Sequence, residues 1–110
     1  MIRAIQGLDG FMNPLIGNLP PSDTIYAVDV VANTSQQIPI PTGANLVVFG
    51  QIPGANQFMK FTNLAISVPS ANILDGTAPE RIPDSRNCAG QGWISIVSDT
   101  AGILTLSFYA

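Results

Sequence analysis

Short runs of β-branched and aromatic residues divide this chain, and proline, glycine, asparagine and aspartate separate the runs. Such runs favour strands, and the residues between them favour tight turns. At 110 residues the chain has the size of one domain that buries a core without disulfides or metal. The sequence predicts an all-β fold, a single jelly-roll-like β-sandwich domain over residues 24–110. The strands are expected at residues 24–32, 36–40, 45–50, 57–61, 65–68, 93–98 and 103–110.

The end of the chain contains the clearest hairpin signal. Alternating apolar residues occupy 93–98 and 103–110, and a turn sequence lies at residues 99–102. A long irregular stretch, residues 69–92, precedes this pair. Connections of that length are uncommon unless they are functional or pack as a loop. We therefore expect a terminal hairpin and a long loop that takes part in function.

Residues 1–23 are expected to form an extended N-terminal arm. Large apolar residues recur there near helical spacing, but three glycines and Pro14 interrupt the pattern. Together these breakers cost a helix about 6 kcal/mol. The arm should lie on its own sandwich or on a neighbouring subunit, and the sequence leaves both open. The arm residues expected to make this contact are Phe11, Met12, Leu15 and Ile16.

The chain carries unusually little charge. Charged residues make up 10% of the sequence, against about 25% in an average domain. Soluble monomers normally keep more surface charge, so we expect copies of this chain or a scaffold to cover much of its surface. The net charge is −3 and the four basic residues are scattered, which argues against nucleic acid as a partner. No run approaches the roughly 18 apolar residues of a membrane helix, so no membrane partner is expected.

Residues suited to catalysis are scarce. The sequence has no histidine and one cysteine, Cys88, so a histidine-assisted nucleophile and an intrachain disulfide are excluded. It also contains no glycine-rich nucleotide-binding loop. We expect no enzymatic activity, no cofactor and no resident metal.

One acidic cluster, Asp75, Glu80 and Asp84, lies in the long loop beside Arg81 and Arg86. Local salt bridges are the favoured interpretation, because the spacing matches no EF-hand calcium loop. A calcium site and a paired-carboxylate catalytic site are the alternatives.

Three aromatic residues with polar groups suggest a second alternative. Trp93, with Tyr26 and Tyr109, has the composition of a sugar-stacking platform. A tryptophan that opens a strand is more often a lid on the core or an interface anchor, and we favour that interpretation.

Three segments resemble small virion structural proteins of tailed bacteriophages, in particular the head decoration proteins that cement capsids. They are IPIPTGANLVVFG, VPSANILDGTAPERIPDSR and WISIVSDTAGILTLSFYA. The resemblance implies a β-sandwich that oligomerises, commonly as a trimer, and clamps adjacent major capsid subunits on the virion surface after assembly in the host cytoplasm. A tail or baseplate component and a carbohydrate-binding adhesin module with Trp93 and Tyr109 are the alternatives. The residues expected at the interface are Phe11, Met12, Leu15, Ile16, Asp75, Glu80, Arg81, Asp84, Arg86 and Trp93.

Overall fold

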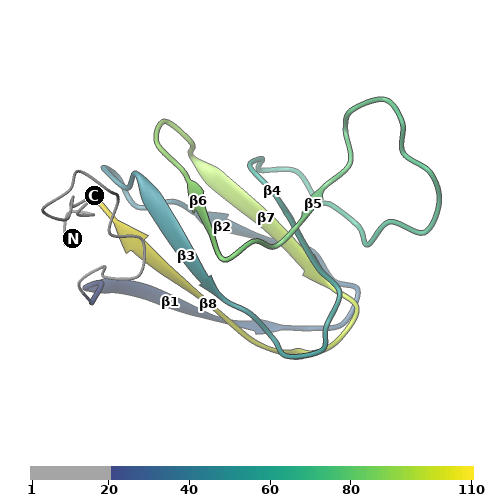
Figure 1. Cartoon of the computed structure of the whole chain (residues 1–110), viewed down its shortest axis with the longest axis horizontal. Helices are drawn as coiled ribbons and strands as arrows, with labels where there is room; N and C mark the ends of the chain where they lie inside the picture. Colours follow the sequence, from purple (N-terminus) through teal and green to yellow (C-terminus); the bar gives the residue numbers. More distant parts are fainter. Residues whose placement is uncertain (1–20) are drawn as a thin grey trace, which may run out of the picture.

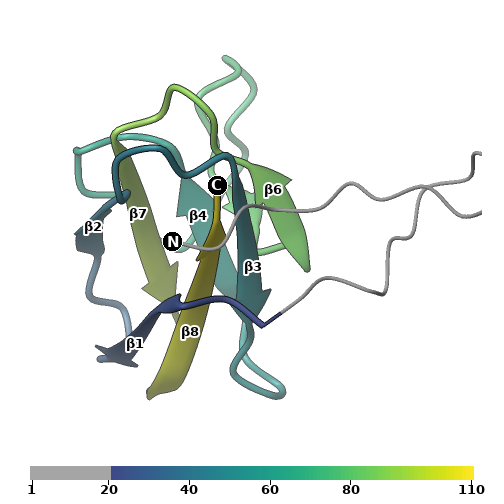
Figure 2. The same cartoon turned by 90° about the vertical axis from the view of Figure 1, so that its left-hand side faces the viewer.

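A computed structural model describes residues 21–110, and Phe11, Met12, Leu15 and Ile16 of the expected arm lie outside the described residues. Two four-stranded antiparallel sheets face each other across the core (Figures 1 and 2). The strands are β1 (Thr24–Val30), β2 (Gln36–Pro39), β3 (Leu46–Gly50), β4 (Gln57–Lys60), β5 (Glu80–Arg81), β6 (Ser85–Asn87), β7 (Trp93–Ser98) and β8 (Gly102–Tyr109).

The strand order is that of a jelly roll. One sheet has the order β1-β8-β3-β6, and the other has the order β2-β7-β4-β5. Consecutive strands lie in opposite sheets at every connection of the described chain except β4–β5. Eight strands wound in this way between two sheets form a jelly roll. The predicted all-β, jelly-roll-like sandwich is therefore confirmed.

Alternating side chains from both sheets fill the core. In β8, Leu104, Leu106 and Phe108 are buried, while the residues between them are more exposed. Tyr26 packs edge-on against Phe108, with the ring centroids 5.3 Å apart. Aromatic pairs prefer this edge-to-face arrangement. The other large buried side chains include Val47, Phe49, Met59, Ile94 and Ile96.

The predicted terminal hairpin is wrong. β7 pairs with β2 and β4, whereas β8 pairs with β1 and β3, so residues 99–101 cross from one sheet to the other. The Asp99 carboxylate fixes this crossing, because it accepts hydrogen bonds from the backbone N (2.9 Å) and Nδ2 (2.7 Å) of Asn56. The corner between β7 and β8 is thereby held against the turn between β3 and β4.

The strand expected at residues 65–68 does not form. The segment that follows β4 instead covers the outer face of β7, where the Ser95 hydroxyl shares its one proton between the carbonyls of Thr62 and Leu64. The backbone N of Ile66 donates to Ser35 Oγ at 3.1 Å, which ties the same segment down. The remaining expected strands are present, and their observed bounds differ from the expected ones by at most two residues. The long stretch 69–92 also contains β5 and β6, which the sequence pattern did not indicate. No helix among residues 21–110 is long and apolar enough to cross a membrane.

Candidate interaction surfaces

Residues 67–79 form a projecting loop that extends from one end of the sandwich (Figure 1). The loop connects β5 to the segment that directly follows β4. Leu74 in this loop is 89% exposed, and Ile73 beside it is 39% exposed. Leu64, just before the loop, is 69% exposed. Grouped apolar side chains held in water mark contact surfaces more often than single exposed ones do.

Short polar contacts shape the part of the projecting loop that returns toward β5. The Asp75 carboxylate accepts hydrogen bonds from Thr77 Oγ1 (2.6 Å) and from the backbone N of Thr77 (3.1 Å). Gly76 between them has a φ of 87°, which glycine adopts without the steric cost of a side chain. The Thr77 hydrogen bonds lower the pKa of Asp75, and the hydroxyl bond contributes most. Asp75 therefore orders the turn that presents Leu74.

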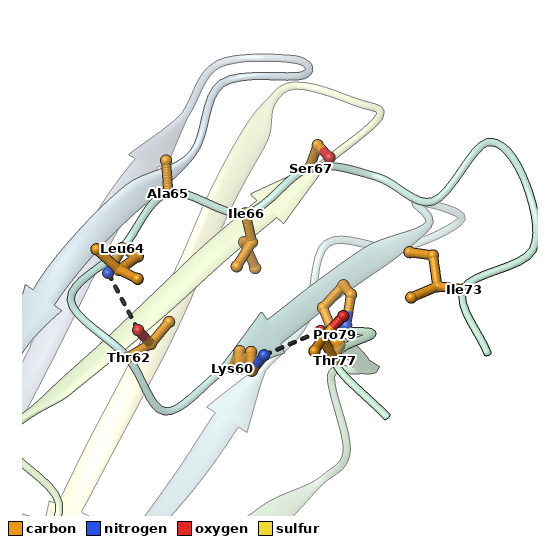
Figure 3. Close-up of a pocket in the computed structure, with 9 residues that line it drawn as sticks. All are labelled: Lys60, Thr62, Leu64, Ala65, Ile66, Ser67, Ile73, Thr77 and Pro79. Carbon is orange, nitrogen blue, oxygen red and sulfur yellow. Dashed lines mark hydrogen bonds between the residues drawn. The ribbon is translucent and has the colours of Figure 1, made fainter. Parts of the chain in front are cut away.

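A shallow hollow of about 390 Å³ lies between the projecting loop and the segment that follows β4 (Figure 3). Its lining contains one titratable side chain, Lys60, whose Nζ donates a hydrogen bond to the carbonyl of Thr77 at 2.9 Å. Leu64, Ile66 and Ile73 supply much of the remaining wall. This lining suits an apolar contact and lacks an acid–base pair.

The ion pair expected in the acidic cluster forms between Glu80 and Arg86. Arg86 Nε donates to Glu80 Oε1 at 3.0 Å, and Arg86 Nη2 donates to Glu80 Oε2 at 2.8 Å. Both side chains are near half exposure, at 40% for Glu80 and 47% for Arg86. The hydrogen bonds and charge of Glu80 raise the pKa of Arg86. Two parallel bonds of this kind fix the orientation of both side chains.

The other charged residues of the cluster do not join this pair. Arg81 Nη1 donates to Asn56 Oδ1 at 3.0 Å, and its guanidinium lies 5.2 Å from the centre of the Phe58 ring. Asp84 is exposed, and its backbone carbonyl accepts a hydrogen bond from Phe49 N. Within residues 21–110, no three aspartate, glutamate or cysteine side chains come together as a metal site.

Asp99 and Asn56 continue the contact that Arg81 makes with Asn56. The hydrogen bonds from Asn56 and from Thr100 hold the pKa of Asp99 below its usual value, and the Asn56 side chain contributes most. Arg81, Asn56 and Asp99 thus form one chain of polar contacts along the outside of the sandwich. This chain positions loops and leaves no reactive group in a cavity.

The sugar-stacking platform considered as an alternative is not assembled. Trp93 is 42% exposed at the start of β7, but Tyr109 is 6% exposed and lies on β8 in the other sheet. Tyr26 packs against Phe108. Trp93 is therefore the one residue of the three that offers a large exposed ring.

Cys88 is fully buried in the core, and this burial raises the pKa of its thiol. A buried thiol with a raised pKa is a poor nucleophile. Its role in this fold is to pack.

Sequence reasoning missed a second apolar surface, on the outer face of β1 and β8. Ile25 of β1 is 57% exposed and Ile103 of β8 is 56% exposed. Val31, directly after β1, is 57% exposed. The sequence of β1 did indicate two different faces, because side chains alternate along a strand. Ile25, Ala27 and Asp29 share one face, and the buried Val28 and Val30 lie on the other. The sequence alone did not show which side faces water.

Comparisons with known proteins place this chain in no established group: no family model, no curated protein and no solved structure matches it.

Proposed function

We propose that this protein is a non-enzymatic virion structural protein that decorates and cements the outer shell of a tailed-phage capsid. It would do so through contacts with major capsid subunits and with its own copies. The observation that carries the proposal is the projecting loop, which holds Leu74 almost fully in water at one end of the sandwich. A loop of this shape suits insertion into a recess between neighbouring subunits.

The energetics of the loop support a contact role. Burying one leucine side chain contributes about 1.5–3 kcal/mol. The turn built by Asp75, Gly76 and Thr77 holds Leu74 in position before binding, which reduces the ordering cost of association. Polar and small residues flank Ile73 and Leu74 in the sequence, and a combination of apolar and polar side chains of this kind is typical of protein interfaces.

The chemistry of the described residues also favours binding over catalysis. Asp75, Glu80 and Asp99 each accept hydrogen bonds within the fold, and the Cys88 thiol is buried. Jelly rolls recur in viral capsid domains and in lectins. That likeness is one of fold, and it agrees with the proposed role in a shell.

Localisation on particles tests this proposal. Antibodies raised against the purified chain would be used for immunogold labelling of particles of the phage that encodes it. Label distributed over the heads is the expected result. Label confined to the tail would assign the chain to the tail or baseplate instead. Purified particles without label, from which mass spectrometry detects no peptide of the chain, would contradict a virion role.

The exposed ring of Trp93 supports a second candidate, a carbohydrate-binding adhesin module. A glycan array separates the two functions, because the cementing role predicts no glycan signal. Binding of the native chain that disappears in Trp93→Ala, without a change in melting temperature, would favour the adhesin.

A further inference from the structure

The four edges of the two sheets differ in their protection against strand pairing. β2, β5 and β6 are edge strands of four, two and three residues. β2 also carries Pro39, and β6 carries Arg86. Short length, proline and basic charge are the features by which edges avoid pairing with other chains. The fourth edge, β1, has seven residues, without proline, lysine or arginine.

The backbone of β1 is oriented to accept another strand. Gln36 Nε2 donates a hydrogen bond to the Asp29 carbonyl at 2.8 Å, so this carbonyl faces away from β8. Residues of an antiparallel strand alternate between facing one neighbour and facing the other. Ile25 and Ala27 therefore also direct their N–H and C=O groups to the free edge. Among residues 21–110, no other strand pairs with this edge.

We propose that β1 pairs antiparallel with β1 of a second copy of this chain, around a two-fold axis at Ala27. Ala27 then lies opposite Ala27 of the second copy, and Ile25 lies opposite Asp29 of the second copy. The two sheets that contain β1 join into one continuous sheet of eight strands. Gln36 releases the Asp29 carbonyl, which accepts the N–H of Ile25 from the second copy in exchange.

Charge favours a second copy as the occupant. Asp29 is the one charged residue of β1, and the proposed register keeps the two Asp29 side chains from facing each other. Like charges directly opposite each other destabilise strand pairs. An antiparallel pair of identical strands is also self-complementary, as a two-fold interface requires. The exposed side chains of Ile25 and Val31 lie at the junction, where each has the other, from the second copy, as a diagonal neighbour.

This inference rests on the self-association that the proposed function includes, and it changes the expected number of chains in the oligomer. Edge pairing through β1 closes with two copies, whereas the phage resemblance implies a trimer. The test uses the purified chain alone, so its failure leaves attachment to a shell untested. Conversely, a chain absent from virions can still form this dimer.

Light scattering after size-exclusion chromatography measures the oligomer across a range of concentrations. The native chain should have the mass of two chains, and Ala27→Lys should weaken the association at least about tenfold, because it sets two like charges opposite each other. The Ala27 side chain is exposed on the outer face of β1, so this variant keeps every strand pair of the sandwich. Ala71→Lys, at an exposed position in the projecting loop, is the matched control and should remain a dimer.

Cysteine cross-linking tests the register. Ala27→Cys should form a disulfide-linked dimer on mild oxidation, because directly opposed strand residues lie within disulfide range. Ala71→Cys should not, and the buried Cys88 should leave the native chain uncross-linked.

Three results would overturn the inference. One is a monomer or a trimer of the native chain at high concentration. Another is a dimer that Ala27→Lys leaves intact. The third is a dimer that depends on the arm. In that case a full-length Phe11→Asp/Leu15→Asp variant would be a monomer, whereas Ala27→Lys would remain a dimer. That third result would assign the contact to residues 1–20.

Discussion

The Arg86 guanidinium binds both oxygens of the Glu80 carboxylate, and this pair links edge strands of opposite sheets. Glu80 belongs to β5 of one sheet, whereas Arg86 belongs to β6 of the other. The pair therefore closes the side of the sandwich opposite to the β1 edge. Within residues 21–110 the two sides of the fold thus differ, since one is fastened by an ion pair and the other ends in β1, which pairs with no strand beyond β8.

The contribution of the Glu80–Arg86 pair to stability should be small in the isolated chain. Exposed ion pairs contribute about 0–1 kcal/mol, because water already solvates both charges. A double-mutant cycle with Glu80→Ala and Arg86→Ala, measured by urea unfolding, should give a coupling energy in that range that falls in 1 M salt. A coupling above about 2 kcal/mol that salt does not change would contradict this prediction, because it would require a pair shielded from water.

Asp99 should make the stability of the fold depend on acid pH. Its pKa in the folded chain lies below its usual value, because of the hydrogen bonds from Asn56 and Thr100. Its contribution is therefore fully present above the unfolded pKa of about 3.9 and is lost as the pH falls through the folded pKa. Asp99→Asn should unfold more easily than the native chain at pH 7, and this difference should shrink below about pH 4.

Urea unfolding at a series of pH values between 7 and 2.5 measures this effect. Asp84→Asn is the control, because Asp84 is exposed and the hydrogen bond from Phe49 N goes to its backbone carbonyl. A difference between native and Asp99→Asn chains that stays constant over the whole pH range would show that the Asp99 charge contributes nothing.

Gln57 should be among the polar residues on which the fold depends most. Its buried side chain accepts a hydrogen bond from Ile52 N at 3.0 Å and donates one to the Ile52 carbonyl at 2.9 Å. Gln57→Ala leaves both backbone groups without these partners, which should cost about 2–4 kcal/mol. Gln51→Ala is the matched control: it removes one hydrogen bond, to the Ile82 carbonyl, from an exposed side chain. If Gln57→Ala and Gln51→Ala lowered the free energy of unfolding in urea equally, the assigned role of Gln57 would be contradicted.

The sequence predicted strands well where apolar and polar residues alternate strictly. β8 is such a case, because Leu104, Leu106 and Phe108 all face the core. Alternation defines the two faces of a strand but not its neighbours, so the sequence pattern predicts a hairpin where the structure has the crossing between β7 and β8. The contact that decides it, between Asp99 and Asn56, joins residues far apart in the sequence. β5 and β6 were missed because they are short and polar.

The same distinction between local and distant contacts explains which features of the candidate surfaces could be predicted from the sequence. Local salt bridges between the acidic cluster and the neighbouring Arg81 and Arg86 were expected from charge and closeness in sequence, and one of them, Glu80–Arg86, forms. The exposure of Leu74 and the open edge of β1 depend on how the whole chain folds around them. Tyr109 matched the composition of a sugar platform, but the fold buries it. Composition led to the expectation that partners cover this chain, and the surfaces proposed for that contact come from the structure.

Rebinding to particles tests the central claim, that the projecting loop attaches this protein to a capsid shell. Purified chain would be added to phage particles assembled without it, and the bound amount would be measured after sedimentation. The native chain and Ala71→Asp should bind alike, whereas Leu74→Asp should bind at least about tenfold more weakly, because it places a charge in the buried centre of the contact. Equal binding of Leu74→Asp, with its fold intact, or no binding of the native chain, would contradict the account.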